Sequence, residues 1–275
     1  MSEVKVNKIS PRSGTTVTLG DSGDTISVPS GVSLSSGANL TLTGALSVDG
    51  ASATIKLDGN YPVGTSNVAL GNQALDDGSL TGGCNVAVGT NALTANTTGS
   101  KNTAIGFESL FSNTTGFANS SIGRHSLLDN TTGICNTGLG HNALRDNIDG
   151  SFNTAVGNNS LISNTTGDDS VAVGNCALAA NTTASDNTAV GSLSLCANTT
   201  GCWNTAVGQD TLKANITGTR NVAIGRIALR SNTTASCNVS VGFGSLESNT
   251  EGASNVAVGT CSLYANTTAS ENTAV

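Results

Sequence analysis

The stretch NVAVGTNALTANTTGSK, Asn85 to Lys101, decides the fold, because near-copies of it follow one another along the chain. An earlier copy opens at Asn67, 18 residues before Asn85. Later copies open every 17 residues, with Ser170 in one place and Asn in the others: Asn102, Asn119, Asn136, Asn153, Asn187, Asn204, Asn221, Asn238, Asn255 and Asn272. Self-similarity at a fixed period indicates a repeat architecture. We call each copy a coil and number its positions 1 to 17 from this residue.

Some positions are fixed in all coils and others vary freely, which separates an inside from an outside. Across the 11 complete 17-residue copies position 5 is always Gly and position 4 is always Val, Ile or Leu. Position 9 is always Leu, which predicts a core of Leu93, Leu110, Leu127, Leu144, Leu161, Leu178, Leu195, Leu212, Leu229, Leu246 and Leu263. Position 12 is always Asn: Asn96, Asn113, Asn130, Asn147, Asn164, Asn181, Asn198, Asn215, Asn232, Asn249 and Asn266.

The residue types within one coil favour β structure. Two-helix repeats need 33 residues or more, so a 17-residue period is too short for them. Positions 2 to 4 form a short β-branched run ended by Gly, a second short segment surrounds position 9, and Asn-Thr-Thr-Gly has turn composition. We therefore predict two strands and two turns per coil in an all-β parallel β-solenoid, or β-roll, over residues 67–275, with about 12 coils and the last truncated at Val275. Stacked coils place each residue above its counterpart every ~4.8 Å, so the position-12 Asn residues should form an amide ladder.

The first strand of each coil carries apolar or small residues on both faces. Position 4 shares one face with position 2, and the Ala of position 3 shares the other with the Gly of position 5. A strand of this kind is usually buried on both sides. One coil can cover only the inner side, so we expect a neighbouring chain to cover the outer one, although Thr at position 2 of several coils tolerates solvent.

Residues 1–66 have a different pattern, with short alternating runs such as TVTLG, DTISVPSG and NLTLTG separated by Gly-containing turns. This pattern predicts a β-rich fibrous or attachment segment, with a boundary near residues 60–64.

Composition and charge exclude several classes of function. Aromatic residues make up 3% of the 275 residues and the net charge is −7, which disfavours a large globular core and non-specific nucleic-acid binding. No run of 18 apolar residues is present, so we expect no membrane insertion. The seven cysteines are an odd number without a C-x-x-C pair, and we interpret them as free thiols.

Two resemblances follow from these motifs. The repeated N-[TSV]-[AS]-[VI]-G followed by [AS]-L resembles the head repeats of trimeric autotransporter adhesins, which form trimeric left-handed parallel β-rolls. The opening VNKISPRSGTTVTLGDSGDTISVPSG, residues 6–31, together with TIKLDGNYPVG, residues 54–64, is similar to tail-fibre proteins of marine bacteriophages. The second resemblance implies a homotrimer in the virion tail, with the N-terminal segment bound to other tail proteins. The opening MSEVKVNKISPRSG lacks the apolar segment of a secretory signal, which favours the phage resemblance.

The residues predict no catalytic site, no cofactor and no metal site. The only two histidines, His125 and His141, would lie in neighbouring coils with Cys135 between them in sequence, but both occupy variable positions where side chains face solvent. The acidic pairs Asp76-Asp77 and Asp168-Asp169 could be hydrolytic carboxylates or Ca²⁺ ligands, yet they stand in turns, and we interpret them as solvated turn residues.

One basic cluster is a candidate ligand patch. Lys213 and Arg230 share position 10 in adjacent coils, and Arg220 and Arg226 lie nearby in the sequence. Stacked like charges repel, so this patch could serve an anionic ligand such as host surface polysaccharide, unless it reflects only random variation of surface residues. Aromatic residues at variable positions could stack on sugars: Phe111, Phe152, Trp203 and Tyr264.

Three functions are consistent with these observations. The first is the shaft of a phage tail fibre that projects a host-recognition tip and itself contacts cell-surface glycans, and the alternative is a bacterial cell-surface adhesin. The third is an ice-binding solenoid, which would favour a T-x-T arrangement on one strand, whereas Thr97-Thr98 are adjacent and in a turn. The Asn-Thr-Thr triplets match a glycan acceptor, but the Asn persists where that pattern fails, in Asn147-Ile148-Asp149. We therefore interpret the triplet as a turn and part of the amide ladder.

Overall fold

The structure, a computed structural model, describes residues 66–275. The N-terminal segment predicted over 1–66, with its boundary at 60–64, lies outside the described residues except for Ser66. Residues 66–275 contain no helix, and accordingly no helix long and apolar enough to cross a membrane.

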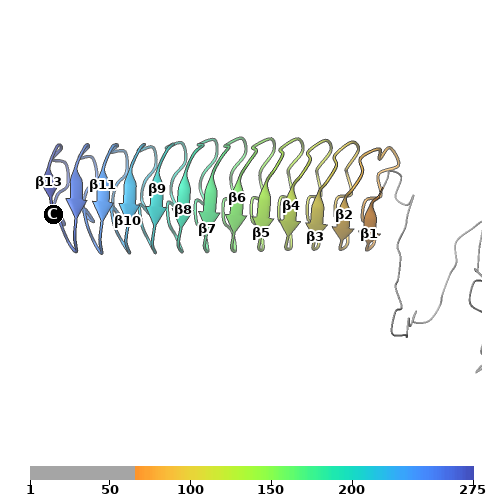
Figure 1. The fold of residues 1–275 in the computed structure, drawn as a ribbon, viewed down its shortest axis with the longest axis horizontal. Helices are drawn as coiled ribbons and strands as arrows, with labels where there is room; N and C mark the ends of the chain where they lie inside the picture. Colours follow the sequence, from red (N-terminus) through yellow and green to blue (C-terminus); the bar gives the residue numbers. More distant parts are fainter. Residues whose placement is uncertain (1–65) are drawn as a thin grey trace, which may run out of the picture. The chain divides into compact units, whose positions relative to one another are not determined.

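Each coil contributes one short strand to a single 13-stranded parallel sheet whose strand order follows the sequence (Figure 1). Position 2 pairs with position 2 and position 4 with position 4, as in Val86↔Thr103 and Val88↔Ile105. The strands are β1 Val68–Leu70, β2 Val86–Val88, β3 Thr103–Ile105, β4 Ser120–Ile122, β5 Thr137–Leu139, β6 Thr154–Val156, β7 Val171–Val173, β8 Thr188–Val190, β9 Thr205–Val207, β10 Val222–Ile224, β11 Val239–Val241, β12 Val256–Val258 and β13 Thr273–Ala274. The prediction of an all-β parallel solenoid with a 17-residue period is confirmed.

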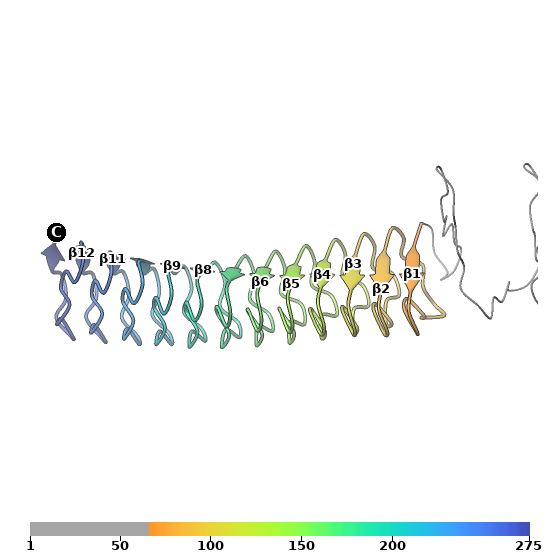
Figure 2. The same cartoon turned by 90° about the horizontal axis from the view of Figure 1, so that it is seen from below.

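The prediction of a second strand around position 9 is wrong, because that segment is a series of turns. Leu161 has φ 48° and Asn159, two residues earlier, has φ 54°, and the same two positions are left-handed in the other coils. A left-handed residue cannot continue a β-strand. Coil-to-coil hydrogen bonds nevertheless persist here: the Leu161 N–H donates to Ala177 O at 2.9 Å, while the Asn159 N–H donates back to His141 O at 3.0 Å. Figure 2 shows the strands along one side of the stack and the turns along the other.

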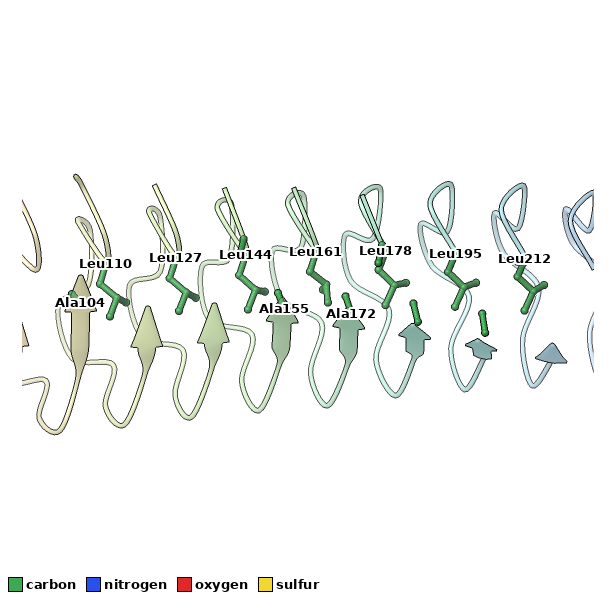
Figure 3. Close-up of a cluster of buried hydrophobic side chains, with 14 of the residues drawn as sticks. Ala104, Leu110, Leu127, Leu144, Ala155, Leu161, Ala172, Leu178, Leu195 and Leu212 are labelled. Atoms are coloured by element: carbon green, nitrogen blue, oxygen red, sulfur yellow. The ribbon is translucent and has the colours of Figure 1, made fainter. Parts of the chain in front are cut away.

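The core lies between these two sides. Leu side chains of position 9 point toward the strands, where the small Ala of position 3 leaves room for them (Figure 3). The left-handed backbone of each Leu costs roughly 1–2 kcal/mol, and burial of the side chain contributes about 1.5–3 kcal/mol, so burial offsets the strain. The position-9 residues from Leu93 to Leu246 are fully buried, and Leu263 in the last described coil is partly buried.

Four Ser side chains at position 8 are buried between the two sides and reach across to the sheet: Ser109, Ser126, Ser194 and Ser245. Ser160 donates instead to Gly157 O within its own coil, and Ser262 Oγ has no partner within residues 66–275. Ser194 Oγ donates to Ala206 O at 3.1 Å, and Ser126 Oγ donates to Gly138 O at 3.0 Å. These bonds satisfy buried hydroxyls that would otherwise destabilise a narrow core.

Candidate functional site

The outer side of the sheet is an exposed apolar surface that runs along the coils. Side chains at position 3 face the core, so those at positions 2 and 4 face outward, and we call this surface the strand face. Several of the position-4 side chains are exposed by more than a third: Leu70, Ile105, Ile122, Leu139, Val190, Val207, Ile224 and Val258. Because the coils stack in register, these aliphatic groups form one continuous stripe along the strands. A contiguous exposed apolar stripe is the usual sign of an interaction surface.

The predicted position-12 residues form a continuous ladder of side-chain amides. Asn164 is representative: its Nδ2 donates to Asn147 Oδ1 at 2.8 Å and to Gly167 O at 2.9 Å, and its Oδ1 accepts from Asn181 Nδ2 at 2.9 Å. The amide-to-amide contact recurs at each of the ten steps from Asn96 to Asn266. These side chains therefore hold neighbouring coils together.

A second row of Asn, at position 1, also joins the coils. Asn153 Oδ1 accepts from the backbone N–H of Ser170 at 3.0 Å, and Asn153 Nδ2 donates across its own coil to Gly167 O at 2.7 Å. One carbonyl thus receives an amide from position 1 and another from position 12. Sequence reasoning did not assign this role, although the near-invariance of position 1 was a signal for it.

The ladder also bears on whether the Asn-Thr-Thr triplets can carry glycans. Asn96 and Asn113 are fully buried, and the Nδ2 of Asn113 donates to Asn96 Oδ1 at 2.8 Å and to Gly116 O at 3.0 Å. A glycan would have to be attached to this same nitrogen, so the folded chain cannot carry one there without losing both bonds.

The four residues of the predicted basic patch do not form one cluster. Lys213 and Arg230 line a shallow hollow together with three small residues, Ala197, Ala214 and Ser231. Lys213 Nζ lies 2.8 Å from Asp210 Oδ1, and Arg230 Nη1 lies 3.5 Å from Glu247 Oε1. Both cations are thus balanced by carboxylates, which weakens the case for an anionic ligand in the hollow.

The other two members of the patch lie against aromatic rings. The Arg220 guanidinium carbon is 5.0 Å from the ring centre of Trp203, and that of Arg226 is 5.9 Å from the ring centre of Phe243. Both distances are within the range of cation–π attraction.

The two histidines are neighbours, and each has a polar partner. Their ring centres are 6.3 Å apart; His125 Nε2 lies 3.1 Å from Glu108 Oε2, and His141 Nε2 lies 3.1 Å from Arg124 Nη1. Cys135 belongs to position 17, away from these two in the coil. No group of three or more His, Cys, Asp or Glu side chains in the described part of the chain is arranged to hold a metal ion.

The acidic pairs take part in turns. The Ser79 hydroxyl donates to Asp77 Oδ1, and the backbone N–H of Ser79 donates to the same atom at 2.8 Å; these bonds lower the pKa of the Asp77 carboxyl. Asp168 Oδ1 accepts from the Ser151 N–H at 2.6 Å, which joins two coils. The seven cysteines are free thiols in the structure.

Comparison of the chain with protein-family models, with curated proteins and with solved structures finds no match.

Proposed function

We propose that this chain forms the shaft of a structural fibre, a phage tail fibre that projects a host-recognition tip, and that three copies associate through the strand face. The observation that carries the proposal is the unbroken aliphatic stripe at position 4 on an otherwise regular stack of coils. Parallel sheets are normally covered on both faces, and residues 66–275 cover only the inner one.

The energetics favour a partner that repeats with the same period. Burying one Val, Leu or Ile side chain from full exposure contributes about 1.5–3 kcal/mol, and each complete coil offers at position 4 one such side chain that is already more than half buried. A partner would therefore gain only part of this free energy per coil. A second copy of this chain presents the same residues at the same spacing, so every coil could contribute to the contact. Association along the whole stack would then be strong even if each coil contributed little. The number of three copies rests on the resemblance to trimeric fibre and adhesin repeats.

The virion assignment rests on the resemblance of residues 6–31 and 54–64 to phage tail fibres, with the N-terminal segment binding other tail proteins and the fibre made in the host cytoplasm. The alternative is an adhesin on a bacterial cell surface. Immunogold labelling with antibodies against residues 67–275 would separate the two, because label on phage tails supports the first and label on uninfected cells supports the second.

Ice binding is a weaker candidate. Of the two Thr residues in the Asn-Thr-Thr turns before the last coil, the first donates its hydroxyl to the next coil, as in Thr165 Oγ1 to Thr182 O at 3.0 Å. On the strand face, Thr at position 2 is interrupted by Val, as at Val171 and Val222, so no unbroken row of hydroxyls is present. We expect no thermal hysteresis from the purified protein.

Sedimentation equilibrium of the full chain at micromolar concentration tests the fibre proposal. We expect a species of three times the 27.1 kDa chain mass. Lysine substitutions on the strand face, Ile122→Lys, Val190→Lys and Ile224→Lys together, should release monomers, because buried unpaired charges are strongly unfavourable. Matched substitutions at exposed position 14, Thr115→Lys, Thr166→Lys and Thr200→Lys, should leave the trimer intact. A wild-type chain that is a stable folded monomer would contradict the proposal.

A further inference from the structure

Five consecutive coils place an unusual set of side chains at position 17: Phe152, Asp169, Asp186, Trp203 and Arg220. All five are exposed, and we call them the position-17 strip. Backbone hydrogen bonds hold each one a single coil from the next; the Asp186 N–H donates to Asp168 O at 3.1 Å and the Trp203 N–H to Ser185 O at 3.4 Å. One coil advances ~4.8 Å, so the two aromatic residues lie three coils, or ~14 Å, apart.

The two aromatic residues contribute little to the fold that carries them. Trp203 and Phe152 are each 54% exposed, so about half of each side chain packs against nothing. Their φ angles are 58° and 59°, a left-handed conformation that bulky residues rarely adopt. Other coils have Ala118 or Ser254 at the same position with the same backbone. Residues that oppose a local preference without a packing gain are expected at functional sites.

Two carboxylates lie between these aromatic rings. The side chains of Asp169 and Asp186 form no hydrogen bond or ion pair with any of residues 66–275, so their oxygens are free to accept hydrogen bonds. They occupy adjacent coils, where like charges repel, although Asp tolerates the left-handed backbone of this position, with φ 53° at Asp169 and 60° at Asp186. At the end of the strip, the Arg220 guanidinium lies 5.0 Å from the Trp203 ring centre, which restrains the indole and leaves N–H donors beside it.

We propose that the position-17 strip binds a neutral polysaccharide chain that runs parallel to the stack of coils. Trp203 and Phe152 would pack against the apolar C–H faces of two sugar rings, Asp169 and Asp186 would accept hydrogen bonds from sugar hydroxyls between them, and Arg220 would donate one. Acidic sugars are excluded by the two carboxylates. This inference deepens the proposed fibre function and rests on it, since it names the class of glycan that the shaft contacts.

Trp203 is the only Trp in the chain, so its fluorescence reports on the strip without background. The full-length protein is titrated with cellohexaose, maltohexaose and the N-acetylglucosamine hexamer, each to about 10 mM. This concentration is high enough to nearly saturate a site whose dissociation constant is about 1 mM. We expect a saturable change in emission with at least one of these neutral oligosaccharides. No response to any of them, or a response only to a galacturonic acid hexamer or to a cationic glucosamine hexamer, would overturn the proposal.

Variants then locate the binding. Asp169→Asn with Asp186→Asn should weaken the neutral oligosaccharide about tenfold, because charged acceptors make the stronger hydrogen bonds. Phe152→Ala should weaken it severalfold, about the effect of one aromatic contact. Trp203→Ala, followed by calorimetry, should abolish it. Phe243→Ala removes an aromatic ring that is 45% exposed and also lies against an Arg, but outside the strip, and should leave binding unchanged. Equal losses in Phe243→Ala and Phe152→Ala would refute the assignment.

The oligomeric state separates this inference from the fibre proposal. A trimer that binds no neutral oligosaccharide would overturn the proposal that the position-17 strip binds polysaccharide, and would leave the fibre proposal standing. A folded monomer that binds one through Trp203 would overturn the fibre assembly and leave the strip.

Discussion

The backbone N–H of Asn187 donates to Ser170 Oγ at 3.3 Å, and this is the longest contact of its row. Elsewhere along position 1 the equivalent distance from N–H to the Asn Oδ1 of the preceding coil is 2.8–3.1 Å. Ser170 also lacks the amide that would cross its own coil. Ala184 O therefore accepts from Asn181 Nδ2, at 2.9 Å, without the second amide that Gly167 O receives one coil earlier.

Restoring the Asn should stabilise the stack. Ser170→Asn would shorten the contact to Asn187 and add an amide bond to Ala184 O, together about 0.5–1.5 kcal/mol for a net new hydrogen bond. The geometry is already present in the chain, because Asn221 Nδ2 donates to Ala235 O at 2.9 Å with Ala at the same position. The free energy of opening that hydrogen exchange measures at the Asn187 amide should rise by about the same amount, so exchange there should slow. Ser170→Ala, which removes the hydroxyl acceptor, should speed it. An unchanged or faster exchange in Ser170→Asn would contradict the role assigned to this row.

The sequence predicts the stacking well because stacking is a property of the repeat. Once the period is 17 and the coils are in register, the side chain of Asn164 must lie beside those of Asn147 and Asn181, whatever the path of the backbone between them. The same logic places Leu161 in the core. It does not say which face of the strand is outward, and the position of Val190 on the strand face comes from the structure. These predictions need only the identity of fixed positions.

The path of the backbone within one coil is harder to predict. Periodicity says that Leu161 is inside, but it does not report φ, and Leu is poorly suited to the left-handed region. Propensity therefore favours a strand where tertiary packing imposes a turn. The arrangement of side chains across one coil is equally hard to predict from the sequence. Position numbers do not show that Asn153 and Asn164 donate to the same carbonyl. They also do not show that Lys213 and Arg230 line a hollow from which Arg220 and Arg226 are absent.

The position-12 ladder predicts a distinct order of stability for two substitutions. Asn164→Ala removes three hydrogen bonds and should cost about 1–3 kcal/mol, since Gly167 O keeps its bond from Asn153. Asn164→Asp should cost more, because a carboxylate has no proton to donate to Asn147 Oδ1 and would be buried beside two acceptor oxygens. Urea unfolding followed by circular dichroism measures both. The exposed Thr166→Ala serves as the control and should change little. If Asn164→Asp were as stable as the wild type, the amide donor would have no role.

Gly at position 5 should not tolerate a side chain. Gly157 has φ 132°, and a Cβ added there would lie 2.6 Å from Gly174 O in the next coil. The contact is with backbone, which cannot move aside without separating the coils, so Gly157→Ala should destabilise by more than about 4 kcal/mol. Gly78→Ala is the matched control, because nothing lies within 4 Å of its added Cβ. The two variants are compared by thermal unfolding. Equal melting temperatures would show that the coils can relax around position 5.

The thiol of Cys196 should be alkylated slowly, because its pKa is raised. Partial burial raises the pKa of the Cys196 thiol, the neighbouring Cys176 raises it further, and Lys213 acts in the opposite direction. The thiolate is the reactive form, so at pH near 8 alkylation by iodoacetamide should be slower at Cys196 than at the exposed Cys237. Mass spectrometry of peptides sampled over time measures both rates in one experiment.

Removing the nearby cation should slow the reaction further. Lys213→Gln eliminates the one charge that favours the Cys196 thiolate, so the rate at Cys196 should fall while that at Cys237 stays constant. Arg230→Gln, one coil further along the same position, is the control and should leave both rates unchanged. A Cys196 that is alkylated as fast as Cys237 in the wild type, or faster in Lys213→Gln, would show that burial and charge do not govern this thiol.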